Sequence, residues 1–256
     1  MKLAIDEYAQ LDSPLHRWET RCKFIGLIVL IFAFSFVQDI RMLPAMVLIT
    51  AAIYAVSRLP VSFLLTRLRY PSIFLLVVVL LLPFTSGQTV VMSIGTLDVR
   101  QEGLITVLLI AIRFLSILTI GLVLFGTAPF LTTIRSMRAL GLPAILTDMA
   151  LLSFRYLGEM GNDLRRMETS MRLRGFHERR LSKRGLSVLA WLGGSILVRS
   201  YEQSEWVYKA MILRGYGQVT HTRDEFRASS SDVVVLVIIL LIAAGLVVGD
   251  ILYRHA

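Results

Sequence analysis

The sequence is poor in the residues that build disulfides, metal sites and nucleotide-binding loops. Its one cysteine, Cys22, cannot form an internal disulfide, and its four histidines are too widely spaced for a local metal-ligand pattern. We therefore expect no metal site and no cofactor. The chain has no G-x-x-x-x-G-K-[ST] loop, so ATP hydrolysis would require a separate subunit. It also has no Ser/His/Asp, Cys/His or paired-carboxylate arrangement, and we predict no catalytic residues and no enzyme activity.

Acidic residues are also scarce, with 18 Asp and Glu against 27 Lys and Arg, a formal net charge of +9. Hydrophobic residues make up 55% of the chain and the mean hydropathy is +0.69, above the range of an ordinary soluble domain. The apolar residues gather in runs such as 24–37 and 233–249, which favour lipid. Excess basic residues of membrane proteins usually lie in cytoplasmic loops, so we expect a bilayer rather than nucleic acid as partner.

Five apolar stretches are long enough to be membrane spans: about 23–38, 42–57, 71–86, 104–126 and 232–252. A 16-residue helix is about 24 Å long and the hydrocarbon core is about 30 Å thick, so the short spans need flanking residues or a thinner bilayer. The connection 58–69 carries three arginines and no acid, which places it in the cytoplasm. We therefore predict a multi-pass plasma (inner) membrane protein with a cytoplasmic N-terminus, no removable signal peptide, and a C-terminus outside.

We divide the chain into a four-span membrane domain (1–128), a cytoplasmic helical domain (129–227) and a C-terminal span (228–256). Residues 130–227 carry a net charge of +7, which suits the cytoplasm. The fold class is thus an all-α integral membrane protein of about five transmembrane helices plus two long amphipathic cytoplasmic helices.

The first of these cytoplasmic helices is predicted between Pro143 and Gly175, residues typical of a helix start and stop. Its apolar stripe recurs at steps of three or four residues: Leu152, Tyr156, Met160, Leu164, Met167 and Met171. The second helix is predicted at about 188–214 and has a weaker stripe: Leu197, Tyr201, Tyr208 and Met211.

The two helices end in a repeated motif. Ser170-Met171-Arg172-Leu173-Arg174-Gly175-Phe176 is repeated forty residues later as Ala210-Met211-Ile212-Leu213-Arg214-Gly215-Tyr216. Helix capping explains the glycine and the arginine of either copy alone. It does not require the shared methionine, leucine and aromatic residue, so the duplication favours two equivalent docking ends. An arginine at such an end can pair with a carboxylate in a partner's groove while its apolar neighbours pack beside it.

These paired Leu-Arg-Gly-aromatic segments resemble the two Arg-centred motifs of the T component (EcfT) of energy-coupling factor transporters. The segment 5–23, IDEYAQLDSPLHRWETRCK, resembles the start of the CbiQ branch, the cobalt-transport members of that family. Many vitamin-transporting members read Ala-Arg-Gly where both copies here read Leu-Arg-Gly, but Arg174 and Arg214 keep their places. The resemblance covers nearly the whole chain.

The resemblance implies a coupling subunit of an importer, with the two helices docked into two ABC-type ATPase subunits. ATP-driven movement would pass to a substrate-binding membrane subunit similar to CbiM. The transported substrate would be cobalt, for cobalamin biosynthesis, with nickel or a vitamin as the alternative. The residues alone leave two other functions open: an intramembrane enzyme with a basic surface for anionic lipid, and an assembly factor or receptor subunit.

Two further sets of polar residues have a structural and a functional interpretation. Arg113 lies in the middle of the fourth span, where an arginine costs at least about 2.5 kcal/mol unless it faces protein, water or a counter-charge. We expect it to face the bundle interior, either as a structural hydrogen-bond donor or as a contact or lock for the substrate-binding partner. Asp12, His16 and Arg17 could form a metal-binding trio, but their irregular spacing favours a structural role.

Overall fold

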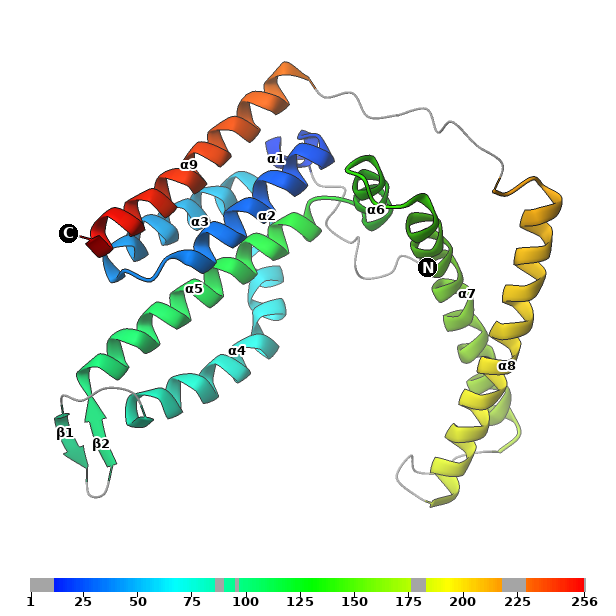
Figure 1. Cartoon of the computed structure of the whole chain (residues 1–256). Coiled ribbons are helices and arrows are strands. Elements are labelled where there is room, and N and C mark those ends of the chain that lie inside the picture. The colour runs from blue at the N-terminus through cyan, green and yellow to red at the C-terminus, as the bar shows by residue number, and fades with distance from the viewer. Residues whose placement is uncertain (1–11, 86–89, 95–96, 176–182, 218–228, 256) are drawn as a thin grey trace. The chain divides into compact units, whose positions relative to one another are not determined.

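The computed structural model describes residues 12–85, 90–94, 97–175, 183–217 and 229–255. The chain divides into two compact units. One consists of Lys2–Gly141 and Phe226–Ala256, and we call it the membrane unit. The other, Leu142–Glu225, is the helix-pair unit. Each unit is described by itself below (Figure 1).

The membrane unit is built from helices, which confirms the predicted all-α class, and one small hairpin that the sequence did not predict. The helices are α1 Pro14–Arg17, α2 Thr20–Phe36, the 3₁₀ turn η1 Ile40–Met42, α3 Leu43–Ser57, α4 Val61–Thr85, α5 Gln101–Gly126, α6 Phe130–Ala139 and α9 Ser230–His255. The antiparallel hairpin joins α4 to α5 and consists of β1 Val90–Ile94 and β2 Leu97–Arg100.

Four helical stretches are long and apolar enough to cross a membrane: Ile40–Ser57, Val61–Leu82, Ile105–Gly126 and Ser230–Leu252. They correspond to four of the five predicted spans. The remaining predicted span, 23–38, coincides with α2, whose 17 residues make a helix of about 25 Å. This helix lies in the middle of the unit and packs against α5, α6 and α9.

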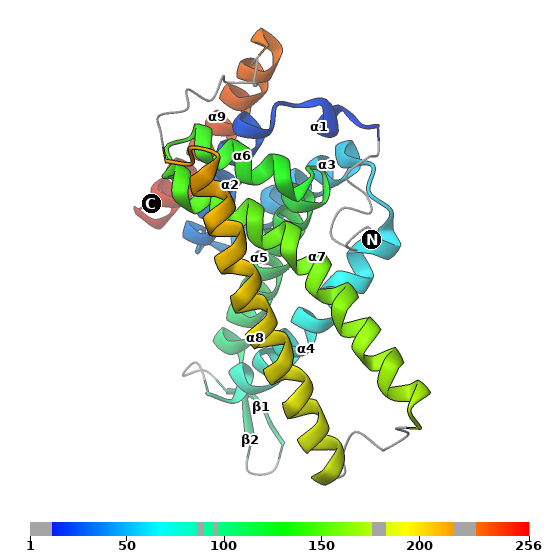
Figure 2. The ribbon, with the colours of Figure 1, turned by 90° about the vertical axis from the view of Figure 1, so that its right-hand side faces the viewer.

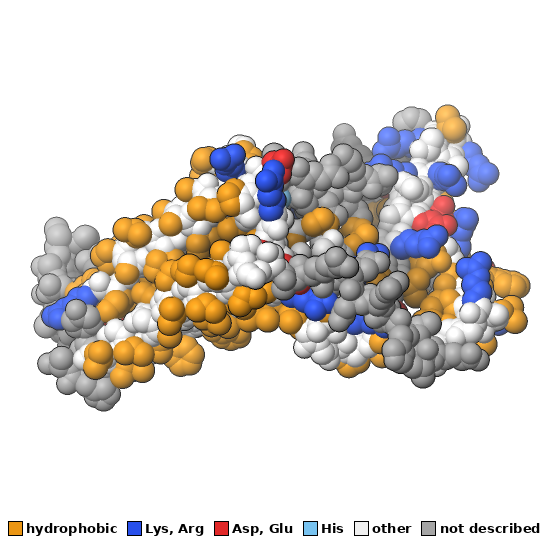
Figure 3. Space-filling view, turned by 90° about the horizontal axis from the view of Figure 1, so that it is seen from above, with side chains coloured by type: hydrophobic (Ala, Val, Ile, Leu, Met, Phe, Trp, Pro, Cys, Tyr) orange, Lys and Arg blue, Asp and Glu red, His pale blue; other side chains and the backbone are white. Residues whose placement is uncertain are grey.

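The apolar face of α2 forms the core of the membrane unit. Leu27, Leu30 and Phe34 are fully buried, together with Met46 of α3 and Ile120 of α5. Hydrophobic side chains also cover most of the outer surface of these helices, as expected for a surface that faces lipid (Figure 3). The unit therefore has both a packed interior and an apolar exterior.

Helix α4 begins ten residues earlier than the predicted span at 71, so most of the connection expected at 58–69 is helical. Pro71 lies inside this helix, where proline removes one backbone hydrogen bond and bends the axis. Figure 1 shows the bend in α4. Arg67 lies over the ring of Phe63 at 5.7 Å, one turn earlier in the same helix.

The helix-pair unit consists of two long antiparallel helices, α7 Ala144–Leu173 and α8 Lys183–Leu213 (Figures 1 and 2). All six positions of the predicted α7 stripe are half-buried, which confirms it. The predicted α8 stripe is wrong in part, because Leu197, Tyr201 and Tyr208 are exposed. The half-buried face of α8 instead carries Val188, Leu192, Ile196, Ser200, Gln203, Val207 and Met211.

Candidate functional site

The first repeated motif ends α7 with a left-handed glycine. Gly175 has a φ of +84°, and its backbone N–H donates to the carbonyl of Arg172 at 3.0 Å. The N–H of Arg174 donates to the carbonyl of Ser170 at 3.2 Å. These bonds satisfy carbonyls of the last turn and stop the helix at Leu173, so the motif is a helix cap. Phe176 lies outside the described residues.

The second motif ends α8 in the same way. Gly215 has a φ of +81°, and its N–H donates to Ile212 O at 2.9 Å. The N–H of Tyr216 donates to Met211 O, also at 2.9 Å, a bond typical of the Schellman motif. Both glycines have open space where a Cβ would lie, so they are required by the backbone conformation rather than by close packing.

Each cap also presents side chains that capping does not use. Leu173 is 84% exposed and Leu213 is 88% exposed, which is unusual for leucine at equivalent places in two helices. Arg172, Arg174 and Arg214 are exposed as well. Within the described part of the chain, neither Arg174 nor Arg214 has a side-chain hydrogen bond or ion pair. Each helix end therefore offers an unpaired cation beside an exposed leucine.

The second motif has an additional attachment to α7. The Tyr216 hydroxyl donates to Asp148 Oδ2 at 3.1 Å, across the open end of the helix pair. Beneath this bond lies an apolar cavity of about 510 Å³ between α7 and α8. Tyr156 and Met160 of α7 line it together with Met211 and Tyr216 of the second motif. The sequence placed Met211 and Tyr216 in the motif but gave no sign of the cavity.

The crossing of α7 and α8 holds a charged group that the sequence analysis missed. Asp163 is only 8% exposed, and its Oδ2 lies 3.4 Å from Nε of Arg199 on α8. Asp163 stands between Met160 and Met167 of the apolar stripe. A carboxylate inside an apolar stripe was the signal available in the sequence, because a buried charge needs a partner.

In the membrane unit, Arg113 of α5 reaches the end of α2. Its Nη2 donates to Val37 O, and Asp250 of α9 is near enough to act as an electrostatic counter-charge. Asp250 is 4% exposed and accepts the backbone N–H groups of Gln38 and Asp39, each at 2.9 Å. Arg113 thus contacts span backbone inside the bundle, as a structural donor does. Asp250 was not predicted.

A second buried cation in this unit was also missed. Lys23 is 1% exposed, and its ammonium group donates to Leu15 O at 2.9 Å and to the carbonyl and hydroxyl of Thr127, each at 3.2 Å. Three acceptors match the three N–H groups of lysine. Lys23 therefore joins the N-terminal segment to the carboxyl end of α5, where the helix dipole favours a cation.

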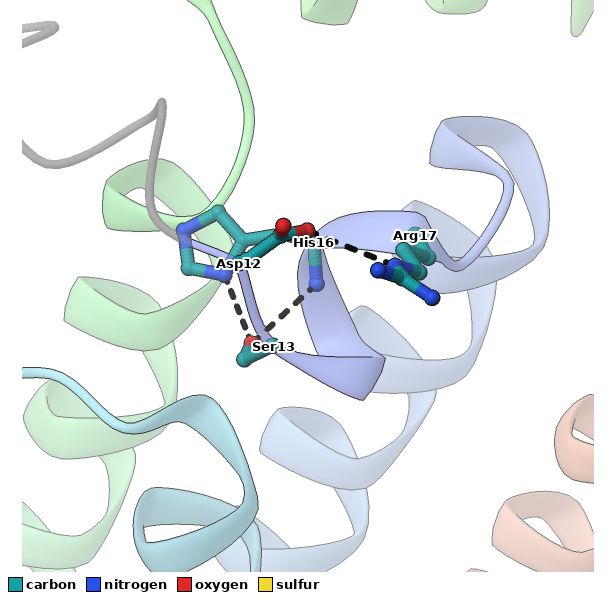
Figure 4. Close-up of polar contacts among 4 residues, drawn as sticks. All are labelled: Asp12, Ser13, His16 and Arg17. Atoms are coloured by element: carbon teal, nitrogen blue, oxygen red, sulfur yellow. Dashed lines mark hydrogen bonds and ion pairs between the residues drawn. The ribbon is translucent and has the colours of Figure 1, made fainter.

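Figure 4 shows the contacts of Asp12, His16 and Arg17. Arg17 pairs with Asp12 at 3.3 Å, and Nδ1 of His16 lies 2.6 Å from the Ser13 hydroxyl, which caps α1. Among the described residues there is no cluster of three His, Cys, Asp or Glu side chains that could hold a metal ion. The contacts fit the structural interpretation of these three residues.

Comparison with known proteins gives the family. The model of the family CbiQ, "Cobalt transport protein", matches residues 12–224. The energy-coupling factor transporter transmembrane protein EcfT of Lactococcus lactis subsp. cremoris (strain MG1363) is 27% identical over 225 residues, 84% of each chain. EcfT of Bacillus subtilis (strain 168) is 24% identical over 226 residues, again 84% of each chain. EcfT of Thermanaerovibrio acidaminovorans (strain ATCC 49978 / DSM 6589 / Su883) is 30% identical over 155 residues, 60% of this chain and 55% of the relative.

The family match covers most of the chain and includes both copies of the repeated motif. Together with the four apolar helices, it makes the chain a multi-pass protein of the plasma membrane. The chain belongs to the CbiQ family and is a transmembrane T component of an energy-coupling factor transporter.

Proposed function

We propose that this T component couples ATP hydrolysis to uptake of a transition-metal ion, cobalt first and nickel second, through the ends of α7 and α8. The observation that carries the proposal is the pair of equivalent caps, each with an unpaired arginine beside an exposed leucine. Arg174 and Arg214 would each enter a groove of one ATPase subunit. Arg172, Met171 and Phe176 would complete the first end, and Met211, Leu213 and Tyr216 the second.

The two caps lie at opposite ends of an antiparallel helix pair, an arrangement that suits two partners rather than one. As the two ATPase subunits close around ATP, the grooves would approach one another, and α7 and α8 would pass the movement on. The receiver would be a CbiM-like substrate-binding subunit held by the apolar surfaces of the chain. In this proposal residues 129–227 and the N-terminus are cytoplasmic and the C-terminus is outside.

The experiment is co-purification with affinity-tagged ATPase subunits, followed by uptake of labelled Co²⁺ in proteoliposomes. Arg174→Ala, Arg214→Ala and the double variant are compared with wild type. Arg165→Ala is the matched control, because Arg165 is an exposed arginine of α7 outside the motif. We expect the double variant to lose ATPase binding or to hydrolyse ATP without uptake, and the control to behave as wild type. If ATPase binding and Co²⁺ uptake are unchanged in the double variant, both motifs act only as helix caps and the proposal is wrong.

The same uptake assay tests the substrate. Competition of labelled Co²⁺ with unlabelled Ni²⁺, in the presence of the substrate-binding subunit, ranks the two ions. We expect Co²⁺ to compete better than Ni²⁺. Stronger competition by Ni²⁺ would identify nickel as the transported ion. Uptake of a vitamin but of neither ion would identify the vitamin as the substrate.

A further inference from the structure

A buried ion pair joins α7 and α8 near the middle of their length. Asp163 is the only buried charged side chain among the described residues of the helix-pair unit. Its Oδ2 lies 3.4 Å from Arg199 Nε on α8, and its Oδ1 lies 3.9 Å from Nη1 of Arg166 on its own helix. One carboxylate thus joins the two helices.

A second contact repeats the same register one turn away. The Ser195 hydroxyl of α8 lies 3.9 Å from the sulfur of Met167 on α7. Moving four residues forward on α7 and four back on α8 leads from the ion pair to this contact, as an antiparallel crossing requires. The crossing is therefore fixed by two contacts in successive turns.

Hollows separate parts of the two helices on the side of the second motif. Between the ion pair and the second motif lies the apolar cavity of about 510 Å³. A polar hollow of about 470 Å³ adjoins the pair itself and is lined by Asp163 and Arg199 together with Gln203 and Trp206. The Tyr216–Asp148 hydrogen bond at the far end is exposed to solvent, and an exposed hydrogen bond contributes only modestly to stability. At 1.5 Å per residue, Arg174 lies about 16 Å along α7 from Asp163, and Arg214 about 22 Å along α8 from Arg199.

We propose that the Asp163–Arg199 ion pair fixes the point at which α7 crosses α8, so that movement of the two motif ends turns the helices about this point. The inference rests on the coupling function proposed above. A slide of one helix turn, about 5.4 Å, would separate the carboxylate from the guanidinium and leave a charge buried without its interhelical partner. Turning about the crossing keeps the pair together. Asp163 and Arg199 are positioning residues, and the motif ends make the ATPase contacts.

The test uses the complete transporter in proteoliposomes and measures ATPase stoichiometry, ATP hydrolysis and Co²⁺ uptake per ATP. Asp163→Asn and Arg199→Gln each break the pair. Arg166→Gln is the matched control, because it removes an arginine beside the same carboxylate without touching the interhelical bond. We expect both pair variants to bind two ATPases and hydrolyse ATP within twofold of wild type, with uptake per ATP at least fivefold lower. The control stays within twofold on all three measures.

Rescue separates positioning from ordinary stabilisation. The exchanged pair, Asp163→Arg with Arg199→Asp, restores at least half of the uptake per ATP if the bond itself matters. Uptake per ATP within twofold of wild type in both single variants overturns the proposal. So does loss of assembly and uptake in parallel, because that outcome describes a structural contact only.

A cross-link tests the fixed point without altering the ion pair. Met167→Cys and Ser195→Cys, in a Cys22→Ser background, are bridged by a short bis-thiol reagent. A fixed crossing keeps at least half of the uptake after bridging, whereas helices that slide lose it, which overturns the proposal. Arg174→Ala with Arg214→Ala is run in parallel. If that double variant is unaffected, the coupling function itself fails. If it is uncoupled but bridging abolishes uptake, or both ion-pair variants keep uptake per ATP within twofold of wild type, only the fixed crossing fails.

Discussion

The two units of this chain bury their residues in different ways. In the membrane unit Leu27, Leu30 and Phe34 of α2 have no exposed surface, so a hydrophobic core holds α2 in place. Among the described residues of the helix-pair unit, no hydrophobic side chain is fully buried, and Trp191, Leu173 and Leu213 are largely exposed. Exposed apolar surface of this extent indicates contact with partners or lipid. The membrane unit thus has a hydrophobic core of its own, whereas the described residues of the helix-pair unit bury no hydrophobic side chain fully.

Buried charges show the same difference. Lys23 and Asp250 of the membrane unit are held by backbone groups of neighbouring segments, which fixes those segments in place. The carboxylate of Asp163 in the helix-pair unit is held instead by the guanidinium group of Arg199, at the end of a long side chain. A backbone partner cannot move without its helix, whereas a side-chain pair can adjust as two helices turn.

The largest expected effect comes from filling the close crossing of α2 and α9 in the membrane unit. A Cβ on Gly26 of α2 would lie 3.2 Å from Trp18 and 3.3 Å from Leu236 of α9. We expect Gly26→Leu to destabilise the protein by about 3 kcal/mol, because small residues allow close helix packing in membranes. Gly193→Leu in α8 is the control, because open space surrounds Gly193. Thermal unfolding in detergent measures both, and equal melting temperatures would contradict the comparison.

The next effect concerns the buried cation. Lys23→Met keeps most of the side-chain volume but leaves the Leu15 and Thr127 carbonyls without their donor, at a cost of about 2 kcal/mol. Lys209→Met in α8 breaks an exposed pair with Glu205 and an exposed cation–π contact with Trp206, and we expect a cost of less than about 1 kcal/mol. The melting temperature of Lys23→Met should therefore be clearly lower than that of Lys209→Met. A loss no greater for Lys23→Met than for Lys209→Met would show that the buried node is dispensable.

Two aspartates of α9 sharpen the contrast between buried and exposed hydrogen bonds. Asp250→Ala leaves the N–H groups of Gln38 and Asp39 unpaired and removes the counter-charge of Arg113, with an expected cost of about 2 kcal/mol. Asp232→Ala removes an exposed bond from the N–H of Ser229 at 3.0 Å, and we expect about 0.5 kcal/mol. Denaturant titration in detergent compares the two. A larger loss of unfolding free energy for Asp232→Ala than for Asp250→Ala would show that the more stabilising contact lies at the start of α9.

The smallest effect on stability is expected in the helix-pair unit. Leu173→Ser and Leu213→Ser change side chains that are almost fully exposed, so the melting temperature of the isolated subunit should shift by less than about 2 °C. ATPase co-purification should nevertheless fall at least threefold if these leucines pack in the partner's grooves. Leu197→Ser, an exposed leucine of α8 outside the motif, is the control. If co-purification is unchanged, Leu173 and Leu213 do not contribute to ATPase docking.

Much of this arrangement was readable in the sequence because hydropathy and helix-stop signals act locally. The helix expected between Pro143 and Gly175 forms as α7, and the apolar run at 232–252 forms the centre of α9. The α8 stripe failed because tyrosines and leucines recur on more than one face of that helix, and only packing decides which face turns inward. The start of α4 was placed too late because Arg67 and Arg69 resemble a loop, although helices readily carry arginine.

The sequence by itself determined the membrane class, the two long helices and the repeated arginine ends, since each depends on residues within a few turns of one another. Only the tertiary structure decided that Lys23 meets Thr127, that Asp250 caps the segment after α2, and that Asp163 of α7 meets Arg199 of α8. These contacts join positions far apart in the chain, and no local pattern encodes which distant partner a buried charge will find. The physical rule that such a charge must have a partner was available from the start, and its identity came from the fold.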